Sequence, residues 1–280
     1  MYLKRGITIH SSLPGISEQV QINNGTMKPG KATGLYYHPG SAVPRVKWRS
    51  PNPAEQRLLM TNGPFTDYRK NIYIGEVPPA LRESLAALGL HKCTELDQVI
   101  PRVKRKEKEV KLVSRKLDKF LRPFSSTGNY KFHRITRAMP GRETTTCFYI
   151  NDRFVYVGLH IDQSRKFTPY TALKSGNRIS INLGSETRYL EYINLTMIQA
   201  VQMIKERSGL TYNDINSDNI STLFFKYCSD YPAIKISLEP YQFYIAPTDN
   251  FFHDATTRFN TKLDVTIVYT GLFDSTPTKK

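Results

Sequence analysis

Two histidines and one aspartate in this chain have the residue types and the spacing of metal ligands. His160 and Asp162 lie in the stretch R-F-V-Y-V-G-L-H-I-D, whose alternation is typical of a half-buried strand. Because side chains two positions apart on a strand share one face, the imidazole and the carboxylate are expected side by side. His253 stands 93 residues later (253 − 160), just before the last predicted strand, and supplies a third ligand. The alternative is that His160 and Asp162 form an ordinary polar pair at a strand end.

Two imidazoles and one carboxylate on one face leave three positions of an octahedron open, as in the non-haem Fe(II) oxygenases. The H-x-D on a strand and the distal histidine, in P-T-D-N-F-F-H-D-A-T-T-R, resemble the Fe(II)/2-oxoglutarate-dependent oxygenases over roughly residues 140–275. In that superfamily the H-x-D lies near the second core strand of a double-stranded β-helix, and the distal histidine lies near the seventh. The resemblance implies Fe(II) and 2-oxoglutarate as cofactors and hydroxylation, or a related oxidation, of a substrate that the sequence does not identify.

The resemblance also implies a cation that binds the C5 carboxylate of 2-oxoglutarate. Many members place an arginine after the distal histidine, where this chain has Arg258 and Lys262. Jumonji-type members place a lysine after the first metal histidine, where this chain has Lys174 (160 + 14) and Arg178 (160 + 18). Arg178 lies on a predicted strand, and the arginine fork suits a carboxylate bidentately. All four residues stay candidates.

Charge is distributed unevenly along the chain. Residues 1–150 contain 26 Lys and Arg and 11 Asp and Glu, a net charge of +15 (26 − 11). Residues 151–280 contain 14 and 13, a net charge of +1 (14 − 13). A basic half attracts polyanions, so nucleic acid is a candidate partner. The alternative is a charged surface that serves solubility alone.

A basic helix is predicted between Pro101 and Leu121, after a shorter helix over residues 79–88. An apolar stripe at helical spacing marks the face toward the core, and it consists of Val110, Val113, Leu117 and Leu121. The other faces either follow a phosphate backbone or are solvated. The residues expected to contact nucleic acid or another polyanion are Arg102, Lys104, Arg105, Lys106, Lys108, Lys111, Arg115 and Lys116.

Strands dominate the predicted second half. Residues 144–150 and 153–161 form a hairpin across Asn151-Asp152, and further strands cover residues 177–184, 187–194, 234–238, 241–246 and 263–272. Helices are predicted over residues 194–208, with Asn194 as N-cap and Gly209 as C-cap, and over residues 218–229. We expect an α+β fold that is mainly β in its second half. A double-stranded β-helix barrel of the jelly-roll or cupin-like kind would occupy residues 140–280, and the helices of a basic region, residues 1–139, would pack on it.

Other features place the chain among cytoplasmic proteins. Its cysteines, Cys93, Cys147 and Cys228, are odd in number and far apart, which indicates reduced thiols. No apolar run is long enough to predict a transmembrane helix, and no signal peptide is predicted.

The leading hypothesis is an Fe(II)/2-oxoglutarate-dependent dioxygenase with an unidentified substrate that is anionic or large. One alternative is a non-enzymatic β-barrel or sandwich protein that binds nucleic acid through its basic N-terminal half. Another is a metal-binding cupin-like enzyme that does not use 2-oxoglutarate.

Overall fold

The computed structural model describes residues 2–30, 35–61, 67–125, 127–162 and 167–274. Within these ranges the chain forms fourteen strands in three sheets and six α-helices. The fold is therefore α+β and mainly β, as predicted. The described strands do not close into a barrel. None of the helices in these ranges combines the length and the apolar character needed to cross a bilayer.

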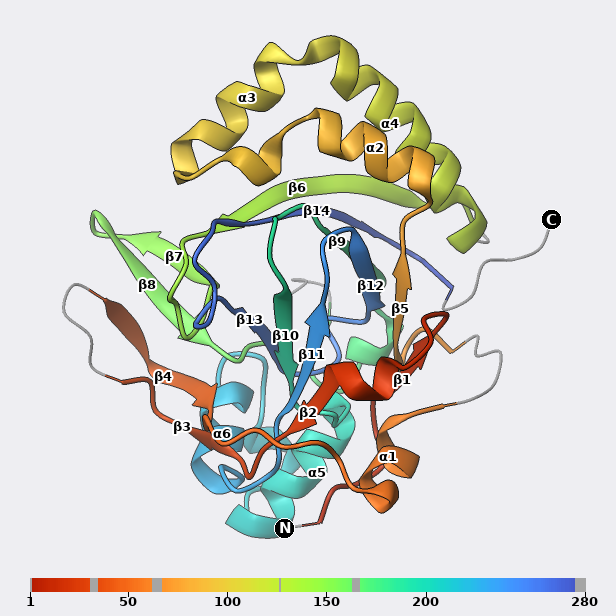
Figure 1. Cartoon of the computed structure of the whole chain (residues 1–280). Helices are drawn as coiled ribbons and strands as arrows, with labels where there is room; N and C mark the ends of the chain where they lie inside the picture. The colour runs from red at the N-terminus through yellow and green to blue at the C-terminus, as the bar shows by residue number, and fades with distance from the viewer. Residues whose placement is uncertain (1, 31–34, 62–66, 126, 163–166, 275–280) are drawn as a thin grey trace.

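The larger sheet contains six strands, and helices cover its outer face (Figure 1). In order across the sheet they are β1 (Thr8–Ser11), β5 (Asn71–Glu76), β12 (Gln242–Ala246), β9 (Asn177–Asn182), β14 (Asp264–Gly271) and β6 (Tyr130–Ala138). Strands β1 and β5 are parallel, and every other neighbouring pair is antiparallel. Strands from both halves of the chain thus share this sheet.

The second sheet contains four antiparallel strands. In order they are β13 (His253–Thr256), β10 (Arg188–Tyr192), β11 (Ile234–Leu238) and β2 (Val20–Ile22). Beyond β13, an isolated antiparallel bridge joins His253 to His160. The chain around His160 therefore continues the edge of this sheet.

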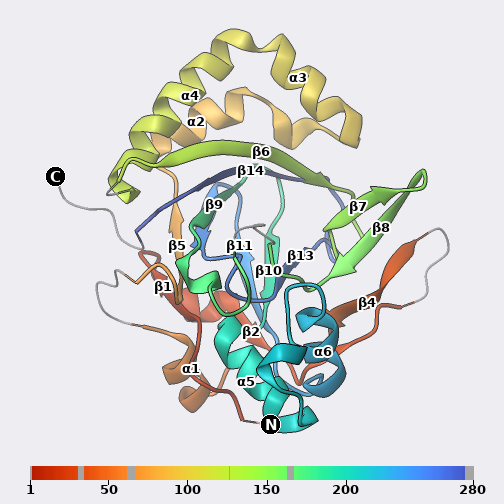
Figure 2. The same ribbon diagram turned by 180° about the vertical axis from the view of Figure 1, so that it is seen from behind.

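The third sheet carries the predicted hairpin. Its strands, in order, are β3 (Thr26–Met27), β4 (Tyr36–Pro44), β8 (Arg153–Gly158) and β7 (Cys147–Ile150). Strands β7 and β8 are joined by Asn151 and Asp152, which have positive φ angles of 48° and 59°. Two such residues match the twist of the flanking strands, and Asn and Asp tolerate this conformation better than most residues. The hairpin extends away from the body of the molecule (Figure 2).

The helices form two groups at opposite ends of the molecule (Figure 1, Figure 2). They are α1 (Pro53–Leu59), α2 (Pro79–Ala87), α3 (Val99–Arg105), α4 (Glu107–Leu121), α5 (Met197–Ser208) and α6 (Ile220–Tyr227). The connections contain the 3-10 helices η1 (Ile16–Gln19), η2 (Leu90–Lys92), η3 (Leu96–Gln98), η4 (Arg122–Phe124), η5 (Ala172–Lys174) and η6 (Tyr212–Asp214). Helices α2, α3 and α4 lie together outside the larger sheet, and α5 and α6 lie at the other end.

The predicted apolar stripe of α4 is confirmed. Val113, Leu117 and Leu121 are buried in one hydrophobic cluster with the outer face of the larger sheet, and Val110 packs against it. Burial of each such side chain stabilises the fold by about 2 kcal/mol. A second cluster joins α5 and α6 to the other side of the core, with Tyr192 among its fully buried residues. The helical layer therefore supports the sheet from outside and leaves its inner face free for a site.

Two helix boundaries differ from the sequence prediction. The single helix expected up to Leu121 is broken at Lys106, whose backbone is non-helical and whose ammonium group donates to the carbonyl oxygen of Ala87 at the end of α2. A cation is favourable at a helix C-terminus, where carbonyl groups lack partners. Helix α5 is capped by Thr196, not by Asn194, because Thr196 and Gln199 form a capping box.

The strand predicted over residues 153–161 is interrupted at Gly158. This glycine has a φ of +70°, and a Cβ atom added there would lie 2.2 Å from the carbonyl oxygen of Ala42. Strand β8 ends at Gly158, and the chain then turns from the third sheet to the edge of the second. The amide of Leu159 donates to the carbonyl of Ala42 at 2.8 Å, which holds the bend. The ligand-bearing segment therefore owes its path to this glycine.

We expect Gly158→Ala to lower the free energy of unfolding by about 2 kcal/mol or more, because it adds both backbone strain and a collision. Gly209→Ala is the matched control: Gly209 also has a positive φ, 72°, but an added Cβ would meet nothing within 4 Å. Urea unfolding of both variants measures the difference. Equal losses in the two variants would contradict the role of the Ala42 contact.

Candidate metal centre

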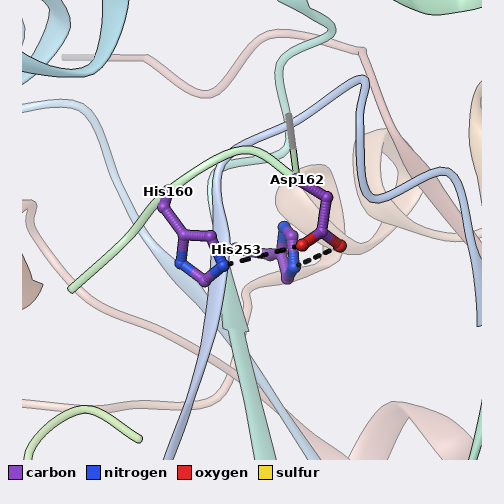
Figure 3. A group of neighbouring side chains, drawn as sticks. All are labelled: His160, Asp162 and His253. Carbon is purple, nitrogen blue, oxygen red and sulfur yellow. Dashed lines mark ion pairs between the residues drawn. The ribbon is translucent and has the colours of Figure 1, made fainter. Parts of the chain in front are cut away.

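The three predicted ligands converge in the folded chain (Figure 3). His160 and His253 exchange two backbone hydrogen bonds, of 3.1 and 2.8 Å, and their ring centroids lie 4.7 Å apart. Two residues further on, the amide of Asp162 donates to the carbonyl of Thr248 at 3.1 Å. Backbone pairing at the bridge and beside it thus positions the backbone from which all three side chains project. Figure 3 shows them pointing toward one another.

The distances between the ligand atoms fit one metal ion. His160 Nε2 lies 3.9 Å from Asp162 Oδ1, and His253 Nε2 lies 3.4 Å from Asp162 Oδ2. One ligand atom from each residue falls within 4.8 Å of the others. Two imidazoles with one carboxylate are the facial donor set of non-haem Fe(II) sites, so these residues fit the ion that the sequence predicts.

The other nitrogen of each imidazole lies near a backbone carbonyl. His160 Nδ1 lies 2.8 Å from the oxygen of Gly158, and His253 Nδ1 lies 3.4 Å from that of Phe251. A neutral ring that donates its Nδ1 proton to such a carbonyl keeps the Nε2 lone pair for a metal. The carbonyls therefore select the tautomer that binds a metal.

Electrostatics favours the metal-binding protonation states of His160 and Asp162. Burial lowers the pKa of His160, and the neighbouring His253 lowers it further, so the ring is neutral. Burial on its own would raise the pKa of Asp162. His253, Arg178 and His160 together outweigh that effect and hold its pKa well below the usual range. Asp162 is therefore a carboxylate and His160 an imidazole base.

Of the four cations predicted to bind the cosubstrate, Arg178 alone lines the cavity beside the triad. Its Nε lies 3.0 Å from Asp162 Oδ2. Lys174, in η5, and Lys262 are exposed, while Arg258 forms an ion pair with Glu143. The role of each in cosubstrate binding stays a prediction.

The triad opens into a cavity of about 890 Å³. Strands of all three sheets border it: Ser180 and Thr266 belong to the larger sheet, Leu190 to the second, and Phe148 to the third. Its volume is in the range that holds small ligands, and hydroxyl, imidazole and guanidinium groups supply polar contacts. The triad thus lies beside a space large enough for a small ligand.

A further cation in the cavity was not among the sequence predictions. Arg188 starts β10, its side chain is 11% exposed, and its Nη1 pairs with Asp264. Its Nε is buried without a hydrogen-bond partner in the described part of the chain. The sequence signal was an arginine that shares one face of a predicted strand with Leu190 and Tyr192, because residues two positions apart lie on the same face. Arg188 lies 28 residues after His160 (188 − 160), beyond the spacings that the oxygenase resemblance suggested.

A buried carboxylate, Asp254, joins β13 to the segment that contains Thr144 and Thr146. The hydroxyl groups of Thr144 and Thr146 both donate to Asp254, and the amide of Thr145 donates to the carbonyl of Ala255 at 3.1 Å. Burial raises the pKa of Asp254. Because Asp254 directly follows His253, these bonds fix the strand from which a ligand projects.

The predicted polyanion-binding residues divide into two groups. Five are exposed on α3 and α4, namely Lys104, Arg105, Lys108, Lys111 and Arg115. Lys116 donates to Ala80 O and Ser84 Oγ at 2.8 and 2.7 Å, and Lys106 donates to α2 as described above. Arg102 is partly buried. Part of the basic charge therefore joins the helices, and nucleic-acid binding by the rest stays a prediction.

Glu191 offers a test of the charges behind the triad. Its cross-strand neighbours are Asp254 on β13 and Lys235 on β11. Burial, with repulsion from Asp254, raises its pKa from 4.5 to about 8 against the opposing effect of Lys235. The stability contributed by the protonated group is present below pH 4.5, declines above it and is lost once the pH passes about 8.

We expect Glu191→Gln to gain stability relative to the unsubstituted protein as the pH rises from 5 to 8, by up to about 1.4 kcal/mol per pH unit. Urea unfolding at several pH values measures this slope, with the exposed Glu83→Gln as the control. A difference that does not change with pH would show that Glu191 is ionised in the folded protein.

Comparison of the chain with protein-family profiles, with curated proteins and with solved structures found no match. The site itself is therefore the basis for a functional proposal.

Proposed function

We propose that this protein is a non-haem Fe(II) oxygenase that couples decarboxylation of 2-oxoglutarate to hydroxylation, or a related oxidation, of a substrate. The observation that carries the proposal is the convergence of His160, Asp162 and His253 on one point inside a cavity of about 890 Å³. Three protein ligands leave coordination positions open for a cosubstrate and oxygen. Bound Fe(II) and 2-oxoglutarate would supply oxidative chemistry that side chains lack.

The strand pairings support a double-stranded β-helix core with its edges extended. From β6 onward, the core segments are β6, the segment at His160, β9, β10, β11, β12, β13 and β14. They pair as nested antiparallel neighbours: β10 with β11, β9 with β12, the His160 segment with β13, and β6 with β14. Such nesting is that of one long hairpin rolled into a jelly roll. In this count His160 is on the second segment and His253 on the seventh, the positions that the oxygenase resemblance requires.

Arg188 is the cation that we assign to the cosubstrate. Arg178 already contacts Asp162, whereas Arg188 lines another part of the cavity wall together with the hydroxyl-bearing side chains of Ser180, Tyr244 and Thr266. An arginine whose Nε is buried and unpaired within the described residues can donate to a carboxylate, and neighbouring hydroxyl groups can donate alongside it. Arg178, next to the metal ligands, would orient Asp162.

Anaerobic titration with Fe(II) and then 2-oxoglutarate tests the centre through the visible charge-transfer band of the chelate. We expect the band in the unsubstituted protein and its loss in His160→Ala and His253→Ala, with iron affinity lowered by more than about 100-fold, since even outer-shell changes cost 10- to 100-fold. His38→Ala, which removes a cavity histidine outside the triad, is the control and should keep the band. Unchanged iron binding in His160→Ala would refute the proposal.

A second test separates the cosubstrate from the metal. Arg188→Met combined with Asp264→Asn removes the cation without leaving its carboxylate partner charged and buried. We expect iron binding to persist and the affinity for 2-oxoglutarate to fall about 30-fold, for the loss of a charge-assisted contact of about 2 kcal/mol. Asp264→Asn alone controls for the partner and should retain 2-oxoglutarate binding. An unchanged affinity in the double variant would exclude Arg188 as the anchor.

A metal-binding cupin-like enzyme that does not use 2-oxoglutarate is the second candidate. The observation that favours it is the ion pair between Arg188 and Asp264, because an acid already neutralises the cation. Iron binding without any charge-transfer band on addition of 2-oxoglutarate would select this candidate.

A further inference from the structure

Exposed aromatic side chains are concentrated on four strands that border the cavity, and these strands are called its mouth below. Of the thirteen most exposed large hydrophobic residues in the described part of the chain, six lie on β4, β6, β7 and β8. These six are Tyr36, Phe132, Phe148, Tyr149, Ile150 and Phe154. The exposed fractions of Phe148 and Tyr149 are 58% and 64%. A concentration of this kind on a protein surface marks an interaction site.

One face of the β7–β8 hairpin continues the cavity wall. Phe148 and Val157 line the cavity. In the antiparallel register Phe148 pairs with Val155, and Ile150 pairs with Arg153. Cross-strand partners and residues two positions apart share a face, so this strip runs from the cavity to the hairpin tip. Its opposite face is aromatic too, because the rings of Tyr149 and Phe154 lie 5.2 Å apart.

The charges beside these aromatic residues are cationic. Strand β6 exposes Lys131, Arg134 and Arg137 and contains no acidic residue, and Arg134 lines the cavity. On the hairpin, the guanidinium of Arg153 lies over the ring of Tyr36 at 4.5 Å. Asp152, in the turn, is the one acid between Cys147 and Gly158. The mouth thus combines ring faces with cations from two sides.

We infer that this surface binds single-stranded nucleic acid as the substrate of the metal centre. Aromatic rings stack on unpaired bases whatever their sequence, and arginines bind the phosphates between them. A buried centre can be reached by a base only after it leaves its stack, and Phe148 on the cavity wall is placed to stack on that base. The substrate role rests on the proposed function, but the binding itself requires neither iron nor 2-oxoglutarate.

The basic helices fit this ligand less well. Helix α4 alternates its cations with Glu107, Glu109 and Asp118, and Leu112 is its one exposed large hydrophobic residue. A surface of this kind contacts phosphates alone and does not distinguish single strands from duplex. The mouth offers both stacking faces and cations, so it is the surface suited to unpaired bases.

Fluorescence anisotropy with a short labelled oligothymidylate, on the full chain without iron, tests the inference. We expect salt-sensitive binding that is tighter than for a duplex of the same length. Phe148→Ala with Tyr149→Ala should raise the Kd about 10-fold or more, since a stacked base contributes about that factor. Arg134→Ala with Arg137→Ala should raise the Kd and also reduce the dependence of binding on salt.

Lys108→Ala with Lys111→Ala on α4 is the matched charge control, and Tyr212→Ala is the aromatic control; neither should change the Kd. The hairpin side chains are exposed, so their replacement should leave the thermal unfolding temperature unchanged. Phe154→Ala is a further hairpin variant, because Phe154 lies on the hairpin face opposite to Phe148. The inference is overturned if the oligonucleotide does not bind, if duplex binds more tightly, or if the hairpin variants leave the Kd unchanged. It is also overturned if the α4 variant loses binding, because the nucleic acid would then lie on the helices. Because the oligonucleotide assay omits iron and the chelate titration omits nucleic acid, either proposal can fail without the other.

Discussion

The antiparallel bridge between His160 and His253 is the interaction on which the centre depends. Two backbone hydrogen bonds join segments 93 residues apart (253 − 160), and each partner in the bridge is itself a candidate ligand. The geometry of the centre is therefore set by main-chain pairing, which is rigid, more than by side-chain rotamers. Gly158 makes the bridge reachable, because only its left-handed conformation beside Ala42 lets the strand leave the third sheet.

Burial has opposite consequences for two carboxyl groups of this region. Asp162 is surrounded by His253, Arg178 and His160, and their charges hold its pKa below the usual range despite desolvation. Glu191 lies on the other face of the second sheet beside Asp254, and desolvation raises its pKa to about 8. Neighbouring charges, not residue type, thus separate a potential metal ligand from a protonated structural acid.

The larger sheet likewise has two different faces. Its outer face receives the apolar stripe of α4, and lysines of this helical layer, such as Lys116, join α4 to α2. Its inner face contributes Arg178, Ser180 and Thr266 to the cavity. The positive charge of the first half is therefore divided between contacts that assemble the helices and cations that remain exposed. Net charge alone could not identify which surface faces a ligand, because the same residue type serves both purposes.

Local pattern was enough for the parts of this protein that depend on neighbouring residues. The sequence predicted the strand alternation, the hairpin turn at Asn151-Asp152 and the apolar stripe of Val113, Leu117 and Leu121. These features depend on periodicity and turn chemistry, which act over a few positions. The residue types and the order of the triad were readable for the same reason. The sequence also contains the residues of the capping box, Thr196 and Gln199, but the nearby Asn194 is a second possible N-cap and was the one predicted.

Tertiary structure decided the rest. Arg188 is a candidate anchor because the pairing of β10 directs its side chain into the cavity wall. Lys106 donates to the carbonyl oxygen of Ala87 because the end of α2 lies beside it. Phe148, exposed on the hairpin, is seen to line the cavity only in the folded chain. Contacts between residues far apart in the chain depend on how sheets pair and bend. No local pattern records that pairing, whereas the chemistry of each ligand is fixed by its own side chain.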